Sequence, residues 1–164
     1  MLLDKLPIEK KLKLIGEVAI LMMDSSIHKH YRVGDISNVI IPALHLNQFR
    51  IYRIGHQPVG FVSWAYLSDE IEKKYTSSPM LLELLDWRSG NNLFFIDFIA
   101  PFGHARKIIQ DLKINIFPDK IVAKALRFKQ VGKLQKVATY YGKNVSRKNL
   151  LNNQEINFGL TNSK

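Results

Sequence analysis

A single carboxylate, Asp97, interrupts the apolar run at residues 93–99, LFFIDFI. Apolar runs of this kind are typical of strands that are buried on both faces. A carboxylate buried there needs a partner, because an isolated charge in a protein interior is very costly. Two interpretations stay open from chemistry alone. Asp97 pairs with an Arg or with backbone amides, or it orients a His as the acid does in a Ser-His-Asp arrangement.

His28 is the His whose context best suits such chemistry. It follows a pair of Ser residues that ends a helical pattern, in a segment expected to be a loop or a helix end. Functional residues concentrate in segments of this kind. His45, His56 and His104 are expected at a helix end, a turn and a helix start, where solvated, capping or structural His residues are common.

Metal, thiol and nucleotide chemistry find little support in the sequence. The chain has no Cys, which excludes disulfides, thiolate metal ligands and a Cys nucleophile. His28 and His30 have one residue between them, a spacing that binds a metal only with further ligands, so we expect no metal site. No P-loop, dinucleotide fingerprint, Gly-x-Ser-x-Gly or His-Glu-x-x-His motif is present.

Hydrophobic periodicity predicts a mixture of helices and strands around these residues. Apolar positions at helical spacing predict helices over residues 7–23 and 104–117. A hairpin is predicted from strands at 48–54 and 59–67, joined by a Gly-His-Gln-Pro turn. The other expected elements are a short helix over 38–44 capped by Asp35 and limited by Pro42, a helix starting at Ser68, a helix over 81–87, and strands over 93–99, 121–128 and 133–141.

These elements fit one α/β (α+β) domain with a mixed, mostly antiparallel sheet flanked by helices. The length of 164 residues suits a single domain, and an apolar share of 46% is that of a soluble globular protein. We predict that the domain covers residues 1–142 and that a polar, weakly ordered tail covers 143–164. The N-terminus lacks a signal-peptide pattern and no apolar run is long enough to span a membrane, so we expect a cytoplasmic protein.

The formal net charge of +10 comes entirely from the C-terminal part of the chain. Residues 1–100 hold 11 basic and 11 acidic side chains, whereas residues 101–164 hold 13 basic and three acidic ones. A one-sided field of this kind attracts an acidic partner and speeds its encounter. Charge alone leaves nucleic acid, an anionic membrane and an acidic carrier protein open, as well as a basic face that only aids solubility.

Several short segments, taken together and in order, are similar to those of one known family. They are Ile15-Gly16-Glu17-Val18-Ala19, Ser25-Ser26-Ile27-His28, Ile41-Pro42-Ala43, Asn47-Gln48-Phe49, Phe61-Val62-Ser63-Trp64-Ala65-Tyr66-Leu67, Asp86-Trp87-Arg88-Ser89-Gly90 and Phe95-Ile96-Asp97-Phe98-Ile99-Ala100-Pro101-Phe102-Gly103. The last two are the most specific, and the similarity runs from about Leu14 to Arg127. The chain resembles the toxin-activating lysine acyltransferases, the hemolysin-activator family encoded beside RTX toxins.

That resemblance implies a GNAT-like fold and an enzyme that takes a fatty acyl chain from acyl-acyl carrier protein. The acyl chain is then placed on internal lysine ε-amines of an RTX protoxin, which activates the toxin. The family's essential His matches His28, its essential Asp matches Asp97, and a Ser beside the catalytic loop matches Ser25. The resemblance also implies a homodimer, and a donor substrate in place of any tightly bound cofactor.

The chemistry of these residues agrees with that reaction. A Lys acceptor has a reference pKa of about 10.4, so at neutral pH it needs a base to become nucleophilic. His28 can remove that proton, or attack the thioester itself and pass on an acyl-imidazole. Asp97 would fix the tautomer of His28 in either route. Arg127 matches a basic strand position of the family and is a candidate for docking the acidic carrier, the competing interpretation being an edge-strand charge that blocks aggregation.

Two other functions stay open as alternatives. A nucleic-acid-binding module is suggested by the basic C-terminal third and by Phe94, Phe95 and Phe98, although no RNP-type or helix-turn-helix pattern is found. A non-catalytic toxin partner would keep the fold without the chemistry, but His28 and Asp97 are both intact. The sequence therefore favours the acyltransferase, with acyl carrier protein and an RTX protoxin as partners and no nucleic acid.

Overall fold

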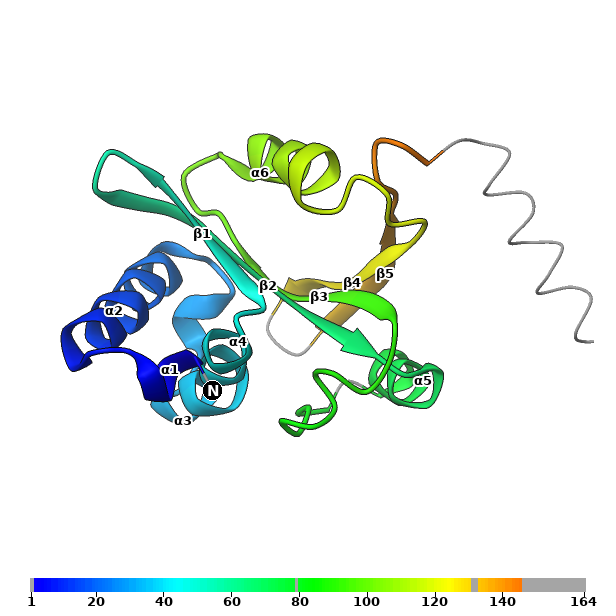
Figure 1. Ribbon diagram of the computed structural model, residues 1–164, viewed down its shortest axis with the longest axis horizontal. Helices are drawn as coiled ribbons and strands as arrows, with labels where there is room; N and C mark the ends of the chain where they lie inside the picture. The colour runs from blue at the N-terminus through cyan, green and yellow to red at the C-terminus, as the bar shows by residue number, and fades with distance from the viewer. Residues whose placement is uncertain (1, 79, 131–132, 146–164) are drawn as a thin grey trace, which may run out of the picture.

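The computed structural model describes residues 2–78, 80–130 and 133–145. They form one five-stranded sheet in the order β1-β2-β3-β4-β5, with helices on both faces (Figure 1). The strands are β1 (Phe49–Ile54), β2 (Gln57–Leu67), β3 (Asn92–Ile99), β4 (Ala123–Gln130) and β5 (Lys133–Tyr140). Neighbouring strands are antiparallel except β3 and β4, which are parallel. The predicted mixed, mostly antiparallel sheet is thereby confirmed, whereas its GNAT-like character stays a prediction.

The N-terminal helices cover one face of the sheet. α1 is Leu2–Lys5, and α2 (Ile8–Asp24) begins after Pro7, whose missing N–H costs nothing at a helix start. The helix predicted over 7–23 is therefore confirmed. The chain continues through η1 (His28–His30), α3 (Val33–Asp35), η2 (Ile36–Ile40) and α4 (Ile41–Leu46).

The helix predicted over 38–44 is longer than expected and is capped differently. Helical backbone runs over residues 33–46, and Asp35 lies inside it rather than in front of it. Asp35 Oδ2 accepts the Arg32 N–H at 2.7 Å, which closes the first turn of α3. Pro42 lies in the first turn of α4, directly after the wider π-type turn η2, so its missing N–H interrupts no regular helix.

The hairpin and the helix that follows it form as predicted. β1 and β2 pair antiparallel, with Ile54 opposite Gln57 at the turn. α5 (Asp69–Ser77) begins at Ser68, whose Oγ accepts the Ile71 N–H at 3.2 Å.

The helix predicted over 81–87 is wrong. Residues 84–87 form turns, and Arg88 makes an isolated bridge to Tyr66 of β2. Asp86 Oδ2 accepts the Glu83 N–H at 2.9 Å, and such local side-chain bonds compete with helical pairing. The Trp87 ring is almost fully buried against the sheet, so tertiary packing also opposes a surface helix here.

β3 and β4 are joined by α6 (Ala105–Asp111) and η3 (Leu112–Ile116), which lie on the face opposite α2 (Figure 1). The helix predicted over 104–117 and the last two predicted strands are confirmed. β3 and β4 pair only where residues 93–95 meet residues 123–125. Beyond that point the two strands no longer pair, which opens the sheet next to Asp97.

Two hydrophobic clusters pack on the two faces of the sheet. The first joins α2 and α4 to sheet residues that include Phe61 and Phe94. The second lies under α6 and η3 and includes Trp64, Phe95 and Leu112. In the part of the chain that the structure describes, no helix is long and apolar enough to cross a membrane.

The chain after β5 is held against η3 and the loop that follows it. Gly142 N–H donates to Lys120 O at 2.9 Å, and Lys143 N–H donates to Lys113 O at 3.0 Å. A Cβ on Gly142 would lie 2.2 Å from Pro118 O, so this close approach requires glycine. Most of the predicted tail, residues 146–164, lies outside the described residues, and the domain boundary at 142 stays a prediction.

Candidate active site

Asp97 lies at a β-bulge between β2 and β3. Ile96 and Asp97 together face the single residue Ser63, because the regular pairs on either side are 95 with 64 and 98 with 62. A bulge of this kind re-aims side chains and leaves a backbone group outside the ladder. The Asp97 N–H instead donates to Ser63 Oγ at 3.1 Å, and both residues are buried. The bulge and the Ser63 hydroxyl therefore fix the backbone from which the carboxylate projects.

Among the described residues, the Asp97 carboxylate contacts His28 and no Arg. Its Oδ1 lies 3.3 Å from His28 Nε2 and also accepts the Tyr31 hydroxyl at 3.3 Å. Its Oδ2 is buried and has no hydrogen-bond partner among the described residues. Asp97 is 4% exposed and His28 is 9% exposed, so the contact is largely shielded from water.

Ser25 extends this contact into a chain of three side chains. Ser25 directly follows α2, and its Oγ lies 2.7 Å from His28 Nδ1. His28 opens the short 3₁₀ turn η1 three residues later, so the local turn brings the hydroxyl and the ring together. The structure thus joins Ser25, His28 and Asp97 in a line, with each ring nitrogen of His28 facing one partner.

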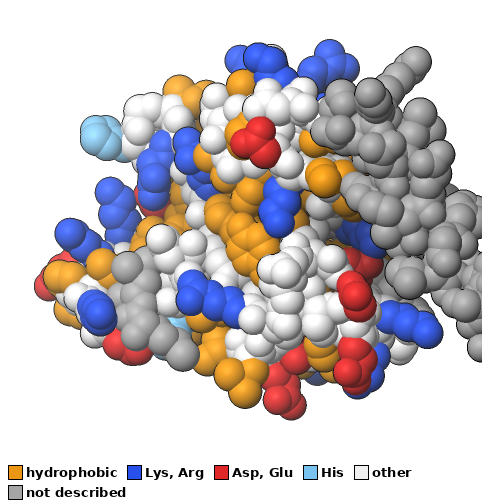
Figure 2. All heavy atoms as spheres, turned by 45° about the vertical axis from the view of Figure 1, so that its right-hand side comes forward, with side chains coloured by type: hydrophobic (Ala, Val, Ile, Leu, Met, Phe, Trp, Pro, Cys, Tyr) orange, Lys and Arg blue, Asp and Glu red, His pale blue; other side chains and the backbone are white. Residues whose placement is uncertain are grey.

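An apolar cavity of about 390 Å³ lies where β3 and β4 stop pairing. Its apolar wall includes Phe95, Leu112, Phe117, Ala123 and Ala125, and its polar wall includes His28, Tyr31 and Asp97. On the face shown in Figure 2, hydrophobic side chains line a central hollow with Lys and Arg side chains beside it. The His–Asp contact therefore borders a space that suits an apolar chain.

Arg127 lies on the cavity wall formed by β4, along with Ala123 and Ala125 at alternate positions of the strand. Its Nη2 donates to Tyr140 Oη at 2.9 Å, and no contact joins it to His28 or Asp97 among the described residues. At Arg127 β4 pairs with β5, but its pairing with β3 ends at Ala125, so the interpretation of Arg127 as an edge-strand charge stays open.

Burial near Asp97 changes the acidity of two tyrosines. Burial and the charge of Asp97 raise the pKa of Tyr31 well above its usual value of about 10. The same two causes raise the pKa of Tyr75, whose ring packs edge-on against Phe94. Both phenols therefore stay protonated and can donate hydrogen bonds throughout the neutral pH range.

Two of the three aromatic residues that suggested nucleic-acid binding are not available for stacking on bases, whereas Phe98 is half-buried. Phe94 is fully buried and Phe95 is 8% exposed, and Phe95 packs edge-on against Phe117 and Tyr140 inside the cavity wall. Base stacking needs exposed rings. The nucleic-acid alternative therefore loses two of the three rings that suggested it.

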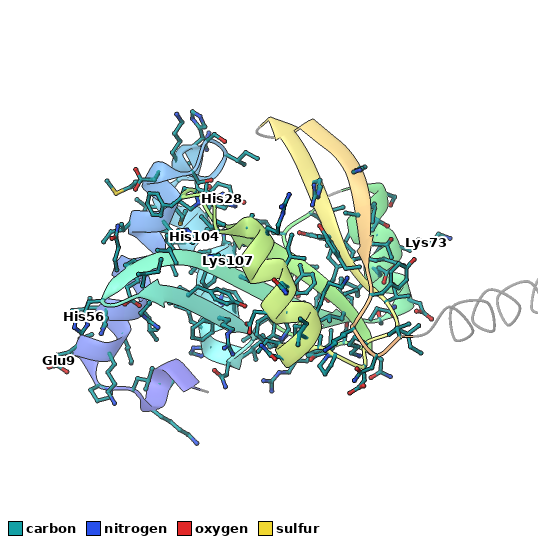
Figure 3. All side chains as sticks on the ribbon, turned by 90° about the horizontal axis from the view of Figure 1, so that it is seen from above. Glu9, His28, His56, Lys73, His104 and Lys107 are labelled. Carbon is teal, nitrogen blue, oxygen red and sulfur yellow. The ribbon has the colours of Figure 1, made fainter. Side chains whose placement is uncertain are left out.

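Sequence reasoning missed Tyr31 and Ser63. Tyr31 follows His28 by three residues, a spacing that places two side chains of one helical turn side by side. Ser63 is the one hydroxyl residue in the apolar stretch at 59–65 of β2, the counterpart of Asp97 in β3. Both signals were readable, but neither identifies its partner without the register of the sheet. Figure 3 also shows His28 near the start of α6, whereas His56 lies apart from it at the β1–β2 turn.

The site has the two parts that acyl transfer needs, a buried His–Asp pair that can act as a base and an apolar cavity beside it. It therefore suits an acyltransferase. Residues 8–141 match the RTX toxin acyltransferase family, and the chain belongs to that family. The resemblance found in the sequence is confirmed.

Individual relatives cover most of the chain. An uncharacterized protein of Synechocystis sp. is 45% identical over 136 residues, which are 81% of this chain and 92% of that protein. The RTX-I toxin-activating lysine-acyltransferase ApxIC of Actinobacillus pleuropneumoniae is 30% identical over 166 aligned positions, covering 92% of this chain and 95% of that protein. The protein-lysine myristoyltransferase HlyC of Escherichia coli is 33% identical over 135 residues, covering 82% and 78%.

Proposed function

We propose that this protein moves a fatty acyl chain from acyl-acyl carrier protein to lysine ε-amines of an RTX protoxin. The observation that carries the proposal is the buried contact between His28 Nε2 and Asp97 Oδ1 on the wall of the apolar cavity. The printed names of the relatives, a toxin-activating lysine-acyltransferase and a protein-lysine myristoyltransferase, support the reaction class and the protoxin acceptor.

The two nitrogens of His28 take different roles in this proposal. An ionised Asp97 can only accept hydrogen bonds, so Nε2 carries the proton that faces Oδ1. Nδ1 then has a free lone pair, which accepts the Ser25 hydroxyl proton at 2.7 Å. His28 Nδ1 is therefore the basic atom of the site, and Ser25 holds it in place until substrate displaces or uses the hydroxyl.

Two routes for the transfer use that lone pair. In the first, His28 takes a proton from the lysine amine, the amine nitrogen attacks the thioester carbonyl, and the carbon–sulfur bond breaks to release the carrier thiol. In the second, Nδ1 attacks the carbonyl and the carbon–sulfur bond breaks, so the carrier leaves as a thiolate. The lysine amine then attacks the acyl-imidazole, the bond from the acyl carbon to Nδ1 breaks, and the proton lost by the amine neutralises the carrier thiolate. Asp97 stabilises the positive charge on the ring in both routes.

The cavity would hold the acyl chain of the donor. Its walls at Phe95, Leu112 and Phe117 are apolar, and burying each methylene of an acyl chain contributes about 0.8 kcal/mol. Ala123 and Ala125 are small residues on the β4 wall of the cavity, which leaves room for the acyl chain. The reacting carbonyl would lie at the polar wall beside His28.

The acidic carrier protein would dock at the basic side of the same cavity. Lys113, Lys120 and Arg127 all belong to its lining, and Tyr140 holds the Arg127 guanidinium in place. Cations at the edge of an interface steer an acidic partner and set its salt dependence. Because the donor is a cytoplasmic carrier, we place the reaction in the cytoplasm. A homodimer, implied by the resemblance, is to be checked by light scattering.

The proposal is tested by intact-mass spectrometry of a purified RTX protoxin incubated with this protein and 14- or 16-carbon acyl-acyl carrier protein. We expect one or more acyl masses on the protoxin, and none when the donor is the carrier without its acyl chain. Protoxin that gains no acyl mass, with a donor that shows no measurable binding, would contradict the proposal. A transient acyl mass on this protein in a single turnover distinguishes the acyl-imidazole route from direct transfer.

A further inference from the structure

Tyr31 is held beside His28 by the turn that positions the His. Its backbone N–H donates to His28 O at 2.9 Å, which closes the 3₁₀ turn η1. The two rings consequently lie with their centroids 5.2 Å apart at an angle of 56°. Tyr31 also lines the cavity, so it borders both the His and the space beside it.

The Tyr31 hydroxyl and His28 Nε2 meet the same carboxylate oxygen. Each lies 3.3 Å from Asp97 Oδ1, whereas Oδ2 is buried without a partner among the described residues. Among the described residues, two groups can therefore donate to the Asp97 carboxylate, the Tyr31 hydroxyl and His28 Nε2. A buried carboxylate that loses one of two donors is held less firmly and is less stable as an anion.

The surroundings of Tyr31 keep its phenol a donor. The titratable groups that face it are His28 on η1, Asp35 on α3, Tyr75 on α5 and Asp97 on β3. Burial and then the charge of Asp97 raise the pKa of Tyr31 far above the range in which a His titrates. The phenol thus keeps its proton throughout that range.

We propose that Tyr31 is a positioning residue that acts through Asp97: its hydroxyl shares Oδ1 with His28 Nε2 and so limits how strongly the carboxylate stabilises a charged His28. The importance of this role for catalysis rests on the proposed function, but the role itself concerns the resting protein. Without the phenol donor, the negative charge of Asp97 is shared with one proton donor fewer. It then stabilises the charged imidazolium of His28 more strongly, so His28 should keep its proton to higher pH.

The test compares wild type with Tyr31→Phe, which removes one oxygen atom and keeps the ring, and with Tyr75→Phe as the matched control. Tyr75 is a second buried tyrosine that is influenced by Asp97, but no hydrogen bond joins its phenol to Asp97 in the described structure. Ring carbon–proton NMR signals of His28, assigned by their absence in His28→Gln, are followed from pH 5 to 9. Acyl transfer is measured over the same pH range.

We expect the pH midpoint of the His28 signal to rise by roughly half to one unit in Tyr31→Phe, the equivalent of one net hydrogen bond. The acid limb of the rate profile should move up with it, and Tyr75→Phe should match wild type in both. A His28 midpoint in Tyr31→Phe that equals the wild-type value or lies below it would overturn the proposal. If the midpoint shifts but wild type transfers no acyl group, the positioning role stands and the proposed function fails.

Discussion

Asp97 Oδ1 lies 3.3 Å from His28 Nε2 because a β-bulge opposite Ser63 places Asp97 outside the regular pairing of β2 and β3. The two residues come from different layers, His28 from the turn after α2 and Asp97 from the middle of the sheet. The end of α2 positions His28, and the bulge with the buried Ser63 hydroxyl positions Asp97. The contact is thus a property of the whole fold rather than of either segment.

Asp97→Asn and Asp97→Ala separate activity from stability. Asn keeps an acceptor for His28 and Tyr31 and removes a buried charge, so the free energy of unfolding should stay within about 1 kcal/mol of wild type. Ala leaves two buried donors without a partner and should lower it by about 1–3 kcal/mol. Both should reduce transfer by about 10²- to 10⁴-fold, since neither stabilises the imidazolium. Urea unfolding and the acylation assay check this, and an Asn variant with wild-type rate would refute the role of the charge.

Ser63→Ala tests the buried hydroxyl at the bulge. The change leaves the Asp97 N–H without its acceptor in a fully buried position, so unfolding should become easier by about 1–3 kcal/mol. Transfer should also fall, because the carboxylate loses its fixed backbone. Ser37→Ala is the control, since Ser37 donates to Gly34 O on the exposed surface. Equal stability of the two variants would show that the bulge holds Asp97 without Ser63.

Arg127→Glu should weaken docking of the acidic donor. We expect kcat/KM for acyl-acyl carrier protein to fall by about 3- to 10-fold at low salt. The difference in kcat/KM between wild type and Arg127→Glu should change more with ionic strength than with the length of the acyl chain. Lys73→Glu on α5 is the matched charge reversal, because Lys73 points away from His28 and is not part of the cavity (Figure 3). If both reversals reduce kcat/KM equally, the effect comes from net charge and Arg127 has no docking role.

Stability should decline in alkaline solution because of buried tyrosines. Burial raises the pKa of Tyr31, Tyr52 and Tyr75 in the folded protein above the value of about 10 in the unfolded chain. Their contribution is fully present below pH 10 and is lost as pH rises further, by at most about 1.4 kcal/mol per pH unit for each tyrosine. Urea midpoints at pH 8, 10 and 11 measure the decline. Tyrosinate absorbance that rises before the protein unfolds would contradict it.

The sequence allowed the strands and long helices to be predicted, because their apolar periodicity is strong and their ends carry Pro7 and Ser68. It failed at residues 81–87, where the Asp86 carboxylate and the burial of Trp87 outweigh a weak helical pattern. Asp35 lies in the first turn of a helix, as its type predicts, but it is the third helical residue and not the residue that precedes the helix.

The candidate site was predictable residue by residue, but not as a constellation. Asp97 stood out as a charge in an apolar strand, and His28 as a His in a functional kind of segment. Their contact depends on the register shift opposite Ser63, which no spacing in the sequence reveals. The pairing came from the resemblance to a family, and the second partner of the carboxylate, Tyr31, is visible only in the three-dimensional arrangement.

The most direct test of the account compares His28→Ala with His56→Ala in the protoxin acylation assay. His56 lies at the exposed β1–β2 turn, so its loss controls for the removal of an imidazole from the same fold (Figure 3). We predict that wild type and His56→Ala add the acyl mass to the protoxin at equal rates. His28→Ala should keep the near-UV circular dichroism of wild type and should transfer at least about 10²-fold more slowly. A folded His28→Ala protein that acylates at the wild-type rate would contradict the assignment of His28 as the base or nucleophile.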